Sequence, residues 1–133
     1  MSLMQAGKNN PVKTTAYTTW MGEDGIARTV VKKNAEVKLK EAVENTEAVF
    51  SLFKDKKFPL LIDSRYIKYI TKEARDHFSI NNRETVIICF GILIDSPLSR
   101  VIGNFFMGLN KPSVPAKLFT NEEEALKWLK KFL

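Results

Sequence analysis

The sequence predicts an α/β domain in which an N-terminal β-hairpin is followed by βα units, giving a mixed, mostly parallel sheet covered by helices. Two β-rich runs flank the turn Gly-Glu-Asp-Gly, which is typical of a hairpin. Farther along, segments with apolar residues every three or four positions alternate with short apolar runs, which favours right-handed crossovers between parallel strands. A chain of 133 residues usually forms one domain. We therefore expect a single domain over 14–133, preceded by a disordered or tag-derived N-terminus at 1–13.

The first half of the domain is predicted to contain three strands and one helix. The hairpin strands cover 14–21 and 26–32. A helix is expected over 35–54, where the apolar residues recur with helical spacing. The apolar run Pro-Leu-Leu-Ile-Asp at 59–63 is typical of a strand that is buried on both faces.

The second half is predicted to contain three helices and two strands. Thr71 caps a helix that carries Ala74, His77 and Phe78 on one face. The segment 84–95 is rich in β-branched residues and is the strongest predicted strand. The remaining elements are a helix that begins at Ser96, a short strand over 116–119 and a final helix with a capping box of Thr120 and Glu123.

Composition and charge exclude several classes of protein. No apolar run is long enough for a signal peptide or a membrane-spanning helix, so we expect a cytoplasmic protein with no membrane span. The net charge of +6 is interleaved with acidic residues, and only Lys-Asp-Lys-Lys at 54–57 is a local basic cluster, so no nucleic-acid partner is expected. The single cysteine, Cys89, excludes an intramolecular disulfide and a cysteine-cluster metal site. We expect neither a metal nor another cofactor.

Two predicted strands end in the same four residues, Leu-Ile-Asp-Ser. If both strands are parallel, Asp63 and Asp95 lie at one edge of the sheet, where α/β folds usually bind ligands. One hypothesis places a polar pocket or a two-carboxylate magnesium site there, formed by Asp63, Ser64, Arg65, Asp95 and Ser96. The alternative, which we favour, is that the aspartates and serines end strands and cap helices, while Arg65 and Arg100 pair with the two aspartates. Since no complete catalytic set is present, we predict no catalytic residue.

The remaining reactive side chains are expected to be structural. His77, the one histidine, shares a helical face with Phe78 and is predicted to pack there. Cys89 lies inside the most apolar strand, where a thiol behaves as a small hydrophobic group.

The helix predicted after Ser96 has an unusual second face. One side is apolar, whereas the other lacks the lysines and glutamates of a solvated surface. A glycine inside a helix costs about 1 kcal/mol relative to alanine, and close approach of another surface would offset that cost. We therefore predict a surface for a protein partner or a homodimer, formed by Ser99, Arg100, Gly103, Asn104 and Met107. The alternative is that another segment of the same chain covers this face.

Three segments of the sequence carry a resemblance to a known fold. LLIDSRYIKYITKEARDHF resembles the strand, connector and helix of the STAS fold, the domain type of bacterial anti-sigma-factor antagonists. SPLSRVIGNFFMGLNKP, together with PAKLFTNEEEALKWL, is similar to a family of small, functionally uncharacterised bacterial STAS-like proteins. The resemblance spans most of 25–133. It implies a single STAS-like domain and no established activity.

The resemblance also identifies a departure from the antagonists. Those proteins carry Asp-Ser-Ser-Gly at the start of the helix after the third strand, and the second serine is phosphorylated. Thr71, Lys72, Glu73 and Ala74 match that motif here, so Glu73 occupies the position of the phosphoacceptor. The resemblance therefore implies that no phosphorylation switch operates at this position.

These observations leave three functional hypotheses. The favoured one is a non-enzymatic STAS-like regulatory or interaction module that acts through a protein partner or through self-association. The second is a module that binds a small apolar ligand or a lipid in an apolar cleft beneath the helix that begins at Ser96. The least favoured is an enzyme of phosphate chemistry that depends on Asp63 and Asp95.

Overall fold

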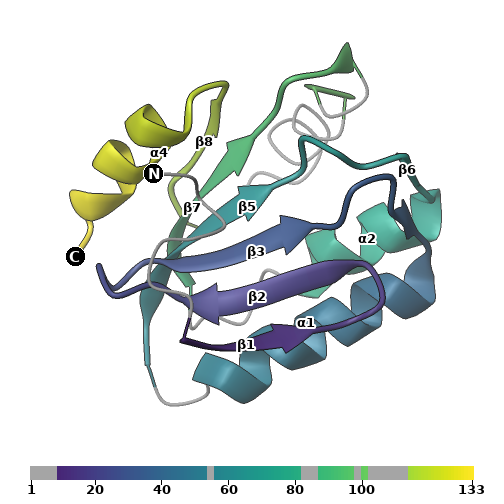
Figure 1. Ribbon diagram of the computed structural model, residues 1–133, viewed down its shortest axis with the longest axis horizontal. Coiled ribbons are helices and arrows are strands. Elements are labelled where there is room, and N and C mark those ends of the chain that lie inside the picture. Colours follow the sequence, from purple (N-terminus) through teal and green to yellow (C-terminus); the bar gives the residue numbers. More distant parts are fainter. Residues whose placement is uncertain (1–8, 54–55, 82–86, 98–99, 102–113) are drawn as a thin grey trace.

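The centre of the molecule is a six-stranded sheet in the order β1-β2-β3-β5-β7-β8 (Figure 1). Its strands are β1 (Asn9–Lys13), β2 (Tyr17–Met21), β3 (Ala27–Val31), β5 (Phe58–Asp63), β7 (Ile87–Leu93) and β8 (Ala116–Phe119). The pairs β1–β2 and β2–β3 are antiparallel, and the pairs β3–β5, β5–β7 and β7–β8 are parallel. This confirms the predicted α/β class with its mixed, mostly parallel sheet. The computed structural model describes residues 9–53, 56–81, 87–97, 100–101 and 114–133.

The N-terminal hairpin is confirmed, and it has a third strand. Tyr17 pairs with Val31 at one end of β2–β3, and Met21 pairs with Ala27 at the other. Gly25 has a φ of +84° in the connecting turn, a conformation that a side chain would strain. β1 covers Asn9–Lys13 and pairs with β2, so residues 9–13 of the segment predicted to be disordered or tag-derived form a strand. Its sequence, Asn-Asn-Pro-Val-Lys, has no apolar alternation that reveals this, because an edge strand is stabilised largely by its backbone pairing.

The described helices cover opposite faces of the sheet (Figure 1). They are α1 (Leu39–Phe53), α2 (Lys72–Asn81) and α4 (Glu122–Lys130). On the α1 face, Val49 of the helix packs with Leu60 and Phe90 of the strands. On the α4 face, Leu129 packs with a second set of strand residues that includes Leu61. Successive residues of β5 therefore enter two different apolar cores, as expected for a strand buried on both sides.

Three boundaries differ from the predictions. The helix expected over 35–54 begins at Leu39, because Glu36–Val37 form a short strand, β4, which pairs in parallel with β6 (Tyr69–Ile70). The N-cap of α4 is Asn121 rather than Thr120: its extended backbone lets Oδ1 accept the Glu124 N–H at 2.9 Å. The strand predicted over 84–95 is β7, which ends at Leu93, two residues earlier than predicted; residues 84–86 lie outside the described residues.

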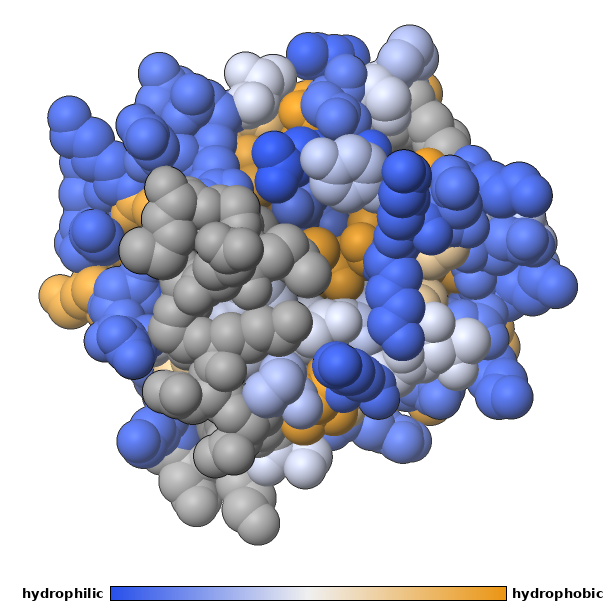
Figure 2. Space-filling model, viewed as in Figure 1, coloured by the Kyte–Doolittle hydropathy of each residue, from blue (hydrophilic) through white to orange (hydrophobic). Residues whose placement is uncertain are grey.

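The exterior is mainly hydrophilic on the face shown in Figure 2, where the described hydrophobic side chains emerge in small areas among hydrophilic ones. None of the helices in the described part of the chain is long and apolar enough to cross a membrane.

Candidate functional site

The structure brings the two Leu-Ile-Asp-Ser segments to the same edge of the sheet. Asp63, the last residue of β5, lies opposite Leu93, the last residue of β7. Ser64 reinforces this pairing because its N–H and its Oγ both donate to the Leu93 carbonyl oxygen, at 3.2 and 2.9 Å. Asp95 and Ser96 follow directly beyond this point. The strand ends that precede Asp63 and Asp95 therefore lie side by side, whereas a ligand site formed by these residues stays a prediction.

Asp63 is held by an arginine at this edge. Its carboxylate is 1% exposed and accepts Nε of Arg65 on Oδ1 at 2.9 Å and Nη2 on Oδ2 at 2.8 Å. The Arg65 backbone N–H also donates to Oδ1, at 3.1 Å. Arg65 Nη2 lies 3.7 Å from Glu122 Oε2, which links the edge to α4. The hydrogen bonds that Arg65 donates to Asp63 raise the pKa of the guanidinium, and they occupy both carboxylate oxygens.

The other predicted edge residues lie in a different environment. Asp95 is exposed, whereas Asp63 is buried. The Ser96 carbonyl oxygen accepts the Arg100 N–H at 2.9 Å, the first hydrogen bond of a helical turn. Within the described ranges, no group of three or more histidine, cysteine, aspartate or glutamate side chains is placed to hold a metal ion. The geometry at this edge supports strand termination and ion pairing.

The start of α2 has the cap that the sequence predicts. Thr71 Oγ1 accepts the Ala74 N–H at 3.2 Å. Glu73, at the position that matches the antagonist phosphoserine, is exposed in the first helical turn. A carboxylate there interacts favourably with the helix dipole. Lys72 pairs with Asp76 one turn farther along, at 3.0 Å.

His77 packs between two helices, and Cys89 packs in the apolar interior. Nε2 of His77 lies 3.0 Å from Thr46 Oγ1 and joins α2 to α1, and partial burial lowers the pKa of the imidazole. Cys89 lies beneath α4, where burial raises the pKa of its thiol to about 11. A buried thiol with that pKa is almost entirely protonated at neutral pH and is a poor nucleophile.

Most of the predicted interaction surface lies outside the described residues. This applies to Ser99, Gly103, Asn104 and Met107. Arg100 is described and is exposed, as is its neighbour Val101. The surface as a whole stays a prediction.

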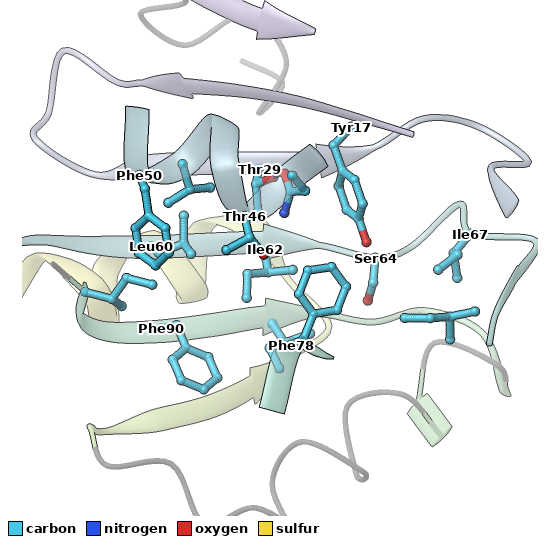
Figure 3. Close-up of a pocket in the computed structure, with 15 residues that line it drawn as sticks. Tyr17, Thr29, Thr46, Phe50, Leu60, Ile62, Ser64, Ile67, Phe78 and Phe90 are labelled. Atoms are coloured by element: carbon cyan, nitrogen blue, oxygen red, sulfur yellow. Dashed lines mark hydrogen bonds between the residues drawn. The ribbon is translucent and has the colours of Figure 1, made fainter. Parts of the chain in front are cut away.

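The sequence did not reveal a cavity of about 90 Å³ that lies between α1, α2 and the sheet (Figure 3). Its walls are largely apolar, but Tyr17, Asn45 and Ser64 also face it. The lining residues come from strands and helices that are far apart in the sequence, so no local pattern marks them. The one available signal is the presence of polar residues such as Asn45 on otherwise apolar, inward-facing positions.

A family model places the chain among related proteins. The family described as "Domain of unknown function (DUF7793)" matches residues 19–133. This chain belongs to that family. A search of curated proteins gave no match.

Solved structures establish the fold of this DUF7793 member. An uncharacterised protein of the DUF3478 family from Shewanella loihica PV-4, described as having a SpoIIAA-like fold, is 16% identical with a TM-score of 0.58 over 92% of this chain and 99% of that one. An anti-sigma factor antagonist from Mycobacterium paratuberculosis is 20% identical with a TM-score of 0.61 over 89% and 97%. A protein of unknown function from Arthrobacter sp. FB24 is 31% identical over 84% and 96%, with a TM-score of 0.34. The first two likenesses confirm the STAS-like, SpoIIAA-like fold.

Proposed function

We propose that this DUF7793 chain is a non-enzymatic regulatory module that acts in the cytoplasm by binding a protein partner at the carboxyl end of its sheet. The STAS-like fold, shared with a protein described as an anti-sigma factor antagonist, fits a regulatory module. The observation that carries the proposal is the position of the exposed hydrophobic side chains.

Three of the four large hydrophobic side chains that are exposed in the described part of the chain follow strands at this end. Leu39 is 46% exposed after β4, Tyr66 is 49% exposed after β5, and Val101 is 61% exposed after β7. The pair β4–β6 lies beyond the carboxyl ends of β3 and β5 (Figure 1). The fourth side chain, Leu133, lies against Gly25 in the β2–β3 turn, at the opposite end. Exposed apolar side chains gathered at one end, with polar residues around them, favour a protein-binding surface.

The charges at this end indicate which kind of partner it fits. In the described segments at this end, the exposed basic residues outnumber the exposed acidic ones. They include Lys38, Lys40 and Arg100, together with Lys68 and Lys72, which pair with Glu36 and Asp76. A symmetric dimer through this end would bring two basic surfaces together, which is unfavourable. The complementary occupant is a different protein that presents acidic residues around an apolar centre.

The chemistry of the neighbouring residues supports a non-enzymatic role. Asp63 is fully engaged by Arg65, so it is not available to activate a nucleophile or to bind magnesium. Glu73 has no hydroxyl group to phosphorylate, so the module is expected to act without a phosphorylation switch at this position.

Charge-introducing variants at the two ends test the proposal. Tagged wild-type protein, Leu39→Glu, Tyr66→Glu and the matched control Leu133→Glu are expressed in cells of the source organism, and co-purifying proteins are quantified by mass spectrometry. We expect one acidic protein to be recovered with wild type and Leu133→Glu and to be at least tenfold depleted with the other two variants. The purified pair should then bind in vitro with an affinity that falls as salt rises, because the contact is partly electrostatic.

Other outcomes contradict this proposal. Recovery that is equal for all four proteins, despite unchanged folding by circular dichroism, would show that this end binds no partner. A dimer of wild type that Tyr66→Glu dissociates, measured by light scattering, would replace the proposed partner with a second copy of the chain.

A further inference from the structure

The cavity between α1, α2 and the sheet is large enough to hold a small molecule. Its volume is about 90 Å³, room for about six water-sized spheres. That is comparable with a single six-membered ring or a chain of a few methylene groups. Phe50 of α1, Ile62 of β5 and Phe78 of α2 point into it from three sides (Figure 3). Most of this wall offers dispersion contacts and no hydrogen bonds.

Two polar side chains on the cavity wall have hydrogen-bonding groups that no described residue engages. Tyr17 and Asn45 are each only 6% exposed. The Tyr17 hydroxyl points along the cavity toward Ser64 (Figure 3), and the structure gives it no partner within the described ranges. Asn45 accepts Thr29 Oγ1 on Oδ1 at 2.9 Å, which leaves its Nδ2 amide hydrogens without a partner in the same ranges. Both groups are donors on residues that line the cavity, so an oxygen atom of a bound ligand could accept a hydrogen bond from each of them.

The charge of such a ligand follows from the same wall. Burial raises the pKa of Tyr17, so its hydroxyl is neutral and able to donate at physiological pH. Among the described lining residues there is no lysine, arginine or histidine to pair with a carboxylate or a phosphate. Burying an unpaired anion is far more costly than burying a neutral oxygen. The cavity therefore selects a neutral acceptor.

We propose that this cavity is a binding site for a small neutral apolar molecule, of one ring or a short chain, that carries a hydroxyl or carbonyl oxygen. The apolar body contacts Phe50, Ile62 and Phe78, and the oxygen accepts hydrogen bonds from Tyr17 Oη and Asn45 Nδ2. This site does not depend on the proposed protein partner, and its test uses the isolated chain.

Phenol and benzene form a matched pair of probes, because they differ by one hydroxyl group. Binding is followed by chemical-shift changes of the labelled methyl groups of Val49 and Ile62 during titration with each probe. One net hydrogen bond is worth about 0.5–1.5 kcal/mol, so we expect phenol to bind about three- to tenfold more tightly than benzene. In Tyr17→Phe, which keeps the ring, the preference for phenol should fall severalfold while the affinity for benzene stays within about twofold. The control Tyr66→Phe removes the hydroxyl of a half-exposed residue that does not line the cavity, so it should leave both affinities unchanged.

Several results would overturn the proposal. One is the absence of a saturable shift at Val49 and Ile62 with either probe. A second is equal binding of phenol and benzene to wild type, and a third is equal loss of both in Tyr17→Phe. Tighter binding of benzoate than of phenol would contradict a neutral ligand. Val49→Leu, which narrows the cavity from α1, should weaken both probes; unchanged affinities in this variant, with an unchanged unfolding midpoint, would place the binding elsewhere.

Discussion

Arg28 is a charged side chain within the protein interior, only 1% exposed on the α4 face of β3. Its Nη1 donates to Asp24 Oδ1 at 2.6 Å and to the Ile26 carbonyl oxygen at 2.8 Å, and Nη2 donates to Asp24 Oδ2 at 2.8 Å. The guanidinium fills the space beside Gly22, where an added Cβ would overlap it and approach Asp24 Oδ1 to 2.6 Å. A glycine in the hairpin turn is thus required by a side chain of the following strand.

Gly22→Ala should therefore destabilise the domain. The added methyl group forces the Arg28 guanidinium away from Asp24, and overpacking of this kind costs about 1–3 kcal/mol. Urea denaturation measures the change in the free energy of unfolding. The double variant Gly22→Ala/Arg28→Met should recover part of the loss because methionine leaves room for the methyl group. A Gly22→Ala protein as stable as wild type would show that the turn adapts freely.

The Asp63–Arg65 pair allows a double-mutant cycle. Arg65→Met leaves the buried Asp63 carboxylate without its cation and should cost about 2 kcal/mol, less than the roughly 3–5 kcal/mol of a fully buried pair because Arg65 is 22% exposed. Asp63→Asn/Arg65→Met should cost less than the sum of the single changes, because the second change removes the unpaired charge. Strictly additive losses, measured by denaturation, would mean that the pair does not couple.

At the scale of elements, α1 and α2 are joined by a polar contact. Thr46 Oγ1 of α1 lies 3.0 Å from His77 Nε2 of α2, and it also donates to the Ala42 carbonyl oxygen at 3.1 Å. Since Thr46 Oγ1 donates its one hydrogen to Ala42, it is placed to accept from a neutral imidazole with a proton on Nε2.

The partial burial of His77 predicts a pH dependence of stability. Burial lowers the pKa of His77 below its ordinary value of 6.5, so the folded state binds fewer protons than the unfolded state in this range. The contribution of His77 is fully present above pH 6.5 and is lost as the pH falls through the lower folded-state pKa. Between pH 7.5 and 5, wild type should lose more stability than His77→Gln, which does not titrate. Parallel urea-denaturation profiles for the two proteins would contradict this.

The sequence predicts the long elements well because their apolar residues follow a clear period. β5 and the core of β7 are apolar runs, and α1 has regular helical spacing over most of its length. β4 and β6 have two residues each, too few for any period, and their pairing joins segments more than thirty positions apart. Thr120 and Asn121 are adjacent and both residue types favour N-cap positions, so the sequence alone does not choose between them. The extended backbone of Asn121 makes it the N-cap of α4.

The candidate sites were predictable only where a local sequence pattern marks them. Asp63 and Asp95 share an edge because both follow apolar strands, and the repeated segment shows this in the sequence. The sequence offers both Arg65 and Arg100 as partners for Asp63, and the structure shows that the partner is Arg65. The cavity depends on how α1 and α2 sit on the sheet, which no single segment encodes.

At the scale of the whole molecule, the sheet separates two apolar cores. Cys89 belongs to the core under α4, together with Leu129, whereas Leu60 faces the core under α1. β5 contributes to both, with Leu61 on the α4 side. Because alternate residues of one strand support the two cores, loss of either core should disrupt the strand on which the other depends.

Cys89 provides a test of this coupling. Its thiol is fully buried with a pKa of about 11, so a thiol reagent at pH 8 should modify it only through opening of the fold. Leu129→Ala and Leu60→Ala make the same deletion on opposite faces, and each should cost about 2–5 kcal/mol. If the domain opens as one unit, both variants accelerate modification by the factor that their own loss of unfolding free energy predicts, about tenfold for every 1.4 kcal/mol. Acceleration by Leu129→Ala beyond its measured loss, with none from Leu60→Ala, would show instead that α4 detaches by itself and that the two cores unfold separately.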